Sequence, residues 1–209
     1  MLALFRDHNF VLWWFGGRIS IMGDYGLIVA LPFYVYSVSR SALATGLIFM
    51  AQMVPPIVLG SVAGVYVDRW DRRRTMIVTE LVLAAVLLPL LAVRSGLSIW
   101  IVPVAAFTEA AVFQFVPPCS SALIPAIVGR DRFAPANALL AAGTNLSVLI
   151  GPPLGALVLH AFGLSGVVLV DVASYLFAAF MVRLIAIQPG MLAKPGPADA
   201  EQGTAFWRE

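Results

Sequence analysis

Long apolar stretches constrain this chain more than any other feature of its sequence. A helix needs about 20 apolar residues to cross the hydrocarbon of a bilayer. Turn-forming or charged segments separate one such stretch from the next. The expected spans are Phe10 to Tyr36, Leu43 to Val67, Thr75 to Val93, Ile99 to Leu123, Asn137 to Phe162 and Val167 to Ile187. The sequence therefore predicts an all-α membrane protein, folded as a six-transmembrane-helix bundle.

The composition supports this class. Only 11% of the 209 residues are charged and 61% are hydrophobic, whereas a soluble domain carries roughly a quarter charged residues. The net charge of +2 does not indicate nucleic acid as a partner, because the basic residues occupy short segments between the apolar stretches. Membrane lipid is the expected surrounding.

The arginines also predict the orientation of the chain. Cytoplasmic loops of membrane proteins carry an excess of Lys and Arg. If the N-terminus is cytoplasmic, the outer segments contain only Arg40 and Arg94. The inner segments then contain Arg6, Arg69, Arg72, Arg73, Arg74, Arg130, Arg132, Arg183, Lys194 and Arg208. We expect a multi-pass protein of the cytoplasmic membrane with both termini on the cytoplasmic side.

Two segments differ in character along the chain. Residues 1–188 form the expected transmembrane bundle, and residues 189–209 are rich in Pro, Gly and Ala without a helical period. Such a composition is typical of a linker. We expect a cytoplasmic tail, and the chain reads as the first part of something longer.

A short internal similarity relates the second and fifth spans. Leu59-Gly60-Ser-Val-Ala-Gly64-Val matches Ile150-Gly151-Pro-Pro-Leu-Gly155-Ala. Equivalent helices of two three-helix repeats would show this pattern. Close helix packing alone also favours small residues at this spacing, so both interpretations stay open.

The segment after the second span carries a specific motif. It reads Gly64-Val-Tyr-Val-Asp68-Arg69-Trp-Asp71-Arg72-Arg73-Arg74. This resembles the motif between helices two and three of the major facilitator superfamily, although Asp71 stands where a second glycine is usual. The resemblance implies that Gly64, Asp68, Arg69, Arg72 and Arg73 act in the conformational change of a transporter.

Other segments resemble one subgroup of that superfamily, the macrolide efflux proteins and the enterobactin exporter. They are Trp13-Trp-Phe-Gly-Gly-Arg-Ile-Ser-Ile-Met-Gly-Asp24, Ser41-Ala-Leu-Ala-Thr-Gly46, Ala136-Asn-Ala138 and Asp171-Val-Ala-Ser-Tyr175. The resemblance runs from Leu4 to about Pro189. It implies one half of a major facilitator fold, with a 3+3 inverted repeat, and a second six-helix half as partner, either a missing C-terminal part or another chain.

The fifth span is similar to the motif that marks exporters of the superfamily. Gly151, Pro152 and Gly155 match it, while Ser147 and Ala156 replace two of its glycines. Both replacements are small, so close packing and a proline kink stay compatible with the sequence. Export is favoured over import on this resemblance.

Four ionisable residues fall inside the expected spans: Arg18, Asp24, Glu109 and Asp171. Such residues are costly in a bilayer and tend to be functional. Asp24 is the first candidate for proton coupling or substrate contact, and Glu109 is the second. Arg18 and Asp24 project about 120 degrees apart around one helix, so Arg18 is left to pair with Glu109 or Asp171. Glu80 is expected to pair with Arg72 or Arg73.

These observations favour a secondary transporter that exports a hydrophobic or amphipathic small molecule, with the export coupled to protons. No cofactor or metal is expected, and with only two histidines and Cys119 as the one cysteine a His/Cys metal site is disfavoured. An enzyme is also disfavoured, although His160, Asp171 and Ser174 would be the residues of a triad. A non-transporting scaffold or regulatory half-transporter is the alternative.

Overall fold

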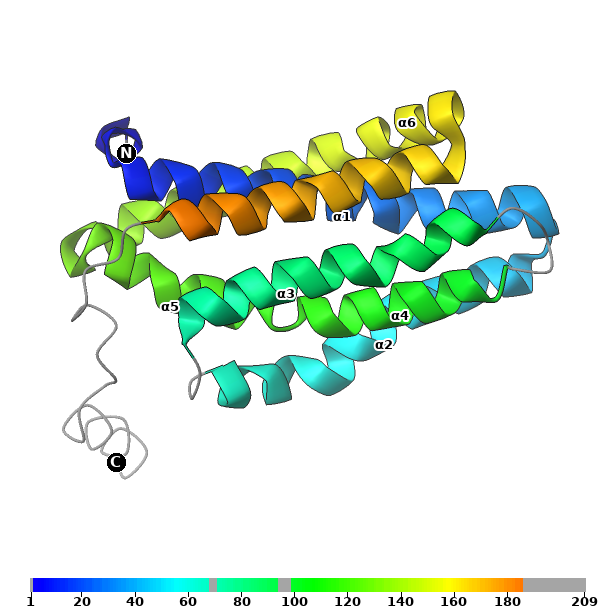
Figure 1. Ribbon diagram of the computed structural model, residues 1–209, viewed down its shortest axis with the longest axis horizontal. Helices are drawn as coiled ribbons and strands as arrows, with labels where there is room; N and C mark the ends of the chain where they lie inside the picture. Colours follow the sequence, from blue (N-terminus) through cyan, green and yellow to red (C-terminus); the bar gives the residue numbers. More distant parts are fainter. Residues whose placement is uncertain (1, 68–70, 94–98, 186–209) are drawn as a thin grey trace.

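The computed structural model describes residues 2–67, 71–93 and 99–185. In this part of the chain every regular element is helical. The elements are η1 (Leu2–Arg6), α1 (His8–Ser39), α2 (Ala42–Val67), α3 (Arg72–Leu87), η2 (Leu88–Ala92), α4 (Ile101–Phe113), α5 (Val116–Val128), η4 (Arg130–Arg132) and α6 (Phe133–Leu184). Figure 1 shows them as an elongated bundle of roughly parallel and antiparallel helices.

Five of the described helical stretches are long and apolar enough to cross a membrane: 8–39, 42–60, 72–92, 101–128 and 133–184. The predicted all-α membrane class is thereby confirmed. Large apolar side chains cover the outside of the bundle, and Leu43, Ile57 and Leu149 are each more than 70% exposed. Water would disfavour such a surface, whereas lipid or another apolar protein surface satisfies it.

The 52 residues of α6 contain a break at Gly163. Its φ of 67° and ψ of −169° are not helical, and a positive φ favours glycine because glycine lacks a Cβ. We call residues 133–162 the first arm and residues 164–184 the second arm. Figure 1 shows α6 turning back at the end of the bundle opposite the N-terminus, so that the two arms run in opposite directions. The predicted separation between the spans that end at Phe162 and begin at Val167 therefore exists, while the count of six spans and the 3+3 repeat remain predictions.

A second interruption separates α4 from α5 within the predicted fourth span. Pro117 and Pro118 follow it directly and have no N–H for the carbonyls of Phe113 and Gln114, four residues earlier. The backbone N–H of Gln114 bonds to the Ala111 carbonyl, and the Gln114 side chain turns back so that its Nε2 donates to the Ala110 carbonyl at 2.9 Å. The helix continues to Val128, five residues beyond the predicted end.

The buried apolar side chains form two clusters. One includes Leu27, Leu31, Leu83 and Leu87, and the other, nearer the N-terminal end of α1, includes Phe10, Trp13, Met76, Leu123 and Val182. Buried carboxyl groups lie at intermediate positions on the same helices, with Asp24 close to the middle of α1. We call the buried residues Asp24, Glu80, Glu109 and Asp171 the carboxyl layer, and the functional site is built around it.

The described arginines are distributed unequally between the two ends of the bundle. Arg40 follows the end of α1, and Arg18 lies within it. The others lie at the opposite end, where α1, α3 and α6 begin and where α2, α5 and the second arm of α6 end (Figure 1): Arg6, Arg72, Arg73, Arg74, Arg130, Arg132 and Arg183. The segments predicted to share one side of the membrane therefore share one end of the molecule.

Candidate functional site: a buried carboxyl layer beside a central cavity

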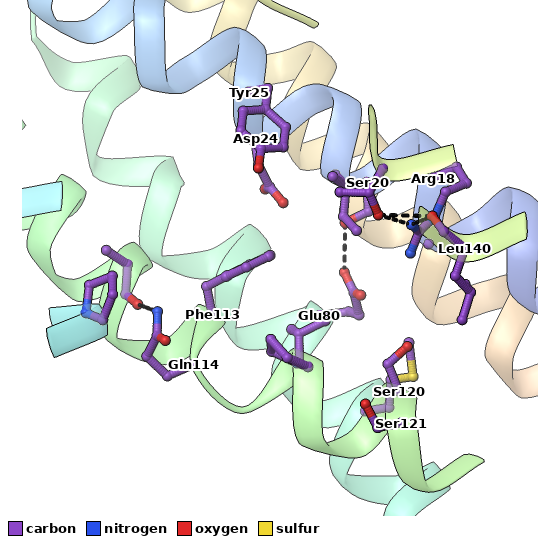
Figure 2. Close-up of a pocket in the computed structure, with 18 of the residues that line it drawn as sticks. Arg18, Ser20, Asp24, Tyr25, Glu80, Phe113, Gln114, Ser120, Ser121 and Leu140 are labelled. Carbon is purple, nitrogen blue, oxygen red and sulfur yellow. Dashed lines mark hydrogen bonds between the residues drawn. The ribbon is translucent and has the colours of Figure 1, made fainter. Parts of the chain in front are cut away.

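A cavity of about 520 Å³ lies between α1, α2, α3, α4, α5 and the first arm of α6. Most of its lining is apolar, from residues such as Met53, Met76, Phe113 and Ile124. Its polar lining includes Arg18, Ser20, Asp24, Gln52, Glu80, Glu109, Gln114, Ser120, Ser121, Asn137 and Thr144. Figure 2 shows several of these side chains around the space.

Three carboxyl groups contribute to this lining from three different helices. Asp24 comes from α1, Glu80 from α3 and Glu109 from α4, and each is at most 5% exposed. Each also lies at least seven residues from either end of the helical stretch that carries it. The predicted intramembrane carboxyls Asp24 and Glu109 are thus brought together, and Glu80 joins them.

Tyr175 on the second arm of α6 connects two of these acids. It is completely buried, and its hydroxyl lies within hydrogen-bonding distance of Asp24 Oδ1 and, at 3.3 Å, of Glu109 Oε1. The other Asp24 oxygen, Oδ2, is buried and has no hydrogen-bond partner among the described residues. One tyrosine therefore joins α1, α4 and α6 at the depth of the carboxyl layer.

Tyr175 was not singled out from the sequence as a site residue. The signal was its spacing, since Tyr175 lies four residues after Asp171 and therefore on the same helix face. Its partners come from 66 and 151 positions away in the chain. No local pattern in a sequence specifies contacts over such separations.

Arg18 does not pair with any carboxyl group among the described residues, so the predicted pairing with Glu109 or Asp171 is wrong. Its Nη1 donates to the Leu140 carbonyl at 3.1 Å and to the Thr144 hydroxyl, both on the first arm of α6. In Figure 2 the dashed lines from Arg18 lead toward Leu140 and away from Asp24 and Glu80. The guanidinium joins two helices and leaves the carboxyl layer without a cation there.

The predicted pairing of Glu80 with Arg72 or Arg73 is also wrong. Glu80 Oε2 accepts a hydrogen bond of 3.2 Å from Ser20 Oγ on α1, as Figure 2 shows. Glu80 lies on the third turn of α3, whereas both arginines lie on its first turn and point to other helices. Glu80 therefore belongs to the carboxyl layer and not to the basic end of the bundle.

Asp171 lies in the same layer but lines a second cavity, of about 440 Å³, between α1 and the two arms of α6. Ser174 Oγ hydrogen-bonds both its Oδ1, at 3.2 Å, and its backbone carbonyl, at 2.8 Å. His160 is exposed on the first arm, and no hydrogen bond joins it to Asp171 or Ser174 within the described ranges. The three residues of the imagined triad are not assembled.

The basic motif joins α3 to neighbouring helices. Arg73 donates from Nε to the Val182 carbonyl at 3.3 Å and from Nη2 to the Arg183 carbonyl, at the end of the second arm of α6. Arg72 Nη1 lies 3.5 Å from the Ala122 carbonyl on α5. Asp68 and Arg69 lie outside the described residues, and Gly64 lies in a part of α2 whose side-chain surroundings are not described.

Asp71, which stands where the superfamily motif usually has glycine, is the N-cap of α3. Its carboxylate accepts a hydrogen bond of 2.8 Å from the backbone N–H of Arg74. A carboxylate in this position satisfies an otherwise unpaired N–H and complements the helix dipole. The departure from the family pattern therefore has a local structural role.

The exporter-like motif is the surface on which the first arm of α6 meets α1. A Cβ added at Gly151 would lie 2.7 Å from the Met22 carbonyl oxygen, and one added at Gly155 would overlap the backbone of Gly26. Pro152 lies between them within the helix. Ser147, one of the two replaced positions, donates to the Arg18 carbonyl at 3.1 Å. The small residues permit a backbone-to-backbone contact.

The comparisons with known proteins agree with this architecture. The family model for the Major Facilitator Superfamily matches residues 13–209. Macrolide efflux protein A of Streptococcus pyogenes is 26% identical over 176 residues, which are 83% of this chain and 44% of that protein. The uncharacterized MFS-type transporter YkuC of Bacillus subtilis is 24% identical over 209 residues, or 100% and 47%.

A third relative, the multidrug efflux pump Tap of Mycolicibacterium fortuitum, is 31% identical over 143 residues, which are 65% of this chain and 35% of that protein. The chain thus spans about half the length of the curated relatives that it matches. The predicted resemblance to the superfamily is confirmed.

Proposed function

Since this chain belongs to the Major Facilitator Superfamily, we propose that it is one half of a secondary active transporter of the cytoplasmic membrane. It would export a hydrophobic or amphipathic small molecule, and proton movement in the opposite direction would supply the energy. A second six-helix half would complete the transport path. The excess of arginine at one end of the bundle supports a cytoplasmic location for that end and for both termini.

The observation that carries the proposal is the carboxyl layer beside the central cavity. Asp24, Glu80 and Glu109 are buried, lie well inside their helices and have no basic partner among the described residues. A carboxyl group in that position is costly when charged, because neither water nor a cation stabilises the charge. It can become neutral by taking up a proton from one side of the membrane, and it can release that proton when the cavity opens to the other side.

The rest of the cavity supports the proposed class of substrate. Its walls are mainly apolar, with a small number of hydroxyl and amide groups. Such a lining suits a molecule with a large apolar surface and few polar groups. Two relatives carry the words macrolide efflux and multidrug efflux in their names, which favours export over import.

Asp24 is the residue on which we base the test. In a transport-competent assembly containing this chain, Asp24→Asn would abolish uphill transport driven by a pH gradient. Downhill exchange would survive at least in part, because asparagine keeps the shape and polarity of the side chain but cannot carry a proton. Erythromycin, a macrolide, is a suitable first probe in proteoliposomes, with substrate-induced proton release measured in parallel.

Two results would contradict the proposal. A parent assembly without transport driven by a pH gradient would remove proton coupling, and a chain that never supports transport would favour a scaffold or regulatory role. If Asp24→Asn released as many protons as the parent, coupling would belong to another acid, with Glu109 as the next candidate. Asp71→Asn is a matched control because Asp71 is an exposed helix cap that does not line the cavity.

A further inference from the structure

We propose that Tyr175 relays a proton between Glu109 and Asp24. This inference rests on the proposed proton coupling and gives the tyrosine a role within it. Tyr175 lies between the two acids, is itself completely buried, and is the described hydroxyl that contacts both of them. The relay would connect α4, α6 and α1 within the carboxyl layer.

Counting hydrogens shows what the two contacts require. A phenol has one hydrogen and can donate only one hydrogen bond, while its oxygen can also accept. Tyr175 Oη lies within hydrogen-bonding distance of one oxygen from each acid. If both contacts are hydrogen bonds, one acid accepts from the phenol and the other donates to it. The carboxyl group that donates must then carry a proton, whereas the one that accepts can do so in either protonation state.

The distances favour one order of donors in this conformation. The contact with Asp24 is the shorter of the two, and that with Glu109 measures 3.3 Å. A hydrogen bond from a neutral hydroxyl to a charged carboxylate is shorter than one between neutral groups. The proposed relay therefore starts with the charge on Asp24 and the proton on Glu109, and its chain of hydrogen bonds runs from Glu109 through Tyr175 to Asp24.

The transfer step is balanced without a further reactant. The O–H bond of Glu109 breaks, and its hydrogen forms a new O–H bond on Tyr175. The original O–H bond of Tyr175 breaks, and that hydrogen forms a new O–H bond on Asp24. No electrons are exchanged between the residues. Tyr175 is neutral before and after the step, the total charge of the three groups is unchanged, and the negative charge has moved from Asp24 to Glu109.

The other ionisable groups near Asp24 and Glu109 form hydrogen bonds with different partners. Asp171 accepts from Ser174, and Glu80 accepts from Ser20. Both acids interact electrostatically with this region, and a negative charge on either of them would favour retention of a proton on the Asp24–Tyr175–Glu109 group. Arg18 binds the first arm of α6, and the layer's described neighbours on α2 and α5 are uncharged.

Infrared spectroscopy of the chain in phosphatidylethanolamine and phosphatidylglycerol vesicles tests the hydrogen count without a transported substrate. We expect a C=O band from a protonated carboxyl group near neutral pH that Glu109→Gln removes. Tyr175→Phe should shift or abolish this band, because the phenol no longer bonds to the acid. Tyr34→Phe is the matched control, since the Tyr34 hydroxyl lies 3.5 Å from the Val93 carbonyl instead of at an acid.

Transport measurements test the relay itself. In a transport-competent assembly, Tyr175→Phe should lower the rate of pH-driven transport by about a hundredfold or more, which is the lower end of what positioned proton transfer contributes. Downhill exchange by the Tyr175→Phe assembly should stay near the parent value. The control Tyr34→Phe should leave the rate of pH-driven transport near the parent value. Since phenylalanine retains the ring, loss of pH-driven transport with exchange intact would not follow from a packing defect.

The outcomes separate the relay from the proposed function. If Tyr175→Phe transports protons at the parent rate, or if its infrared carboxyl band is unchanged, Tyr175 is not a relay although proton coupling stands. If the parent shows no proton-driven transport, the proposed function fails. The infrared band then decides the hydrogen count independently, because that measurement requires no transport.

Discussion

Arg73, on the first turn of α3, binds the end of the second arm of α6 through the carbonyl of Val182, at 3.3 Å from its Nε, and through that of Arg183. The last carbonyls of a helix lack donors within the helix, and a cation there also complements the helix dipole. A residue of the superfamily motif thus holds two helices together at the arginine-rich end of the bundle.

We expect Arg73→Ala to weaken this junction more than Arg74→Ala. Arg74 is exposed and serves as a matched removal of positive charge from the same turn. Hydrogen bonds of a charged group contribute about 1.5–3 kcal/mol, so Arg73→Ala should lower the thermal stability in detergent measurably, whereas Arg74→Ala should change it little. Equal stability of the two variants would show that the Arg73 hydrogen bonds to the end of α6 do not stabilise the bundle measurably.

The contact between Gly155 and Gly26 predicts a severe effect of a single methyl group. Gly155→Ala should destabilise the bundle, because the added Cβ would overlap the Gly26 backbone and force α1 away from the first arm of α6. Gly46→Ala is the control, since a Cβ there meets nothing within 4 Å and alanine is favoured over glycine in a helix by roughly 0.5–1 kcal/mol. Thermal unfolding followed by Cys119 labelling measures both variants, and a stable Gly155→Ala protein would contradict the close approach.

A double-mutant cycle tests the position of Arg18. The losses of stability from Arg18→Gln and Asp24→Asn should add within about 0.5 kcal/mol, because the structure gives the two side chains no common interaction. Arg18→Gln and Thr144→Val should instead show a coupling energy above that margin, since their side chains are hydrogen-bonded. Strong coupling of Arg18 to Asp24 would restore an ion pair that the structure does not contain.

The orientation of the bundle predicts a pattern of labelling from the two sides of the membrane. In a Cys119→Ser background, cysteines at the exposed positions Arg74 and Asp131 should react with an impermeant maleimide only from the cytoplasmic side, and a cysteine at Arg40 only from outside. Labelling of the Arg40 position from the cytoplasm alone would reverse the proposed topology. The unmodified Cys119 is buried, and replacing it avoids background reaction.

The sequence alone was sufficient for the class and for the approximate positions of the apolar helices. Apolar length determines which stretches can lie in a membrane. The predicted bounds at Thr75, Phe162 and Ile187 lie within three residues of the start of α3 at Arg72, the break at Gly163 and the end of α6 at Leu184. The family motif likewise lies in consecutive positions of the sequence. These features depend on short-range chemistry, so they can be recognised without knowing which helices touch.

The tertiary structure alone decided the partners of the buried polar groups. Helical periodicity excluded an Arg18–Asp24 pair but left Arg18 to Glu109 or Asp171, and the structure directs it to Leu140 and Thr144 instead. Glu80 moves from the basic end to Ser20, and Tyr175 joins Asp24 to Glu109. A helix's own sequence fixes which of its faces is polar, but the hydrogen-bond partner depends on the packing of other helices against that face, and residues distant in the chain determine that packing.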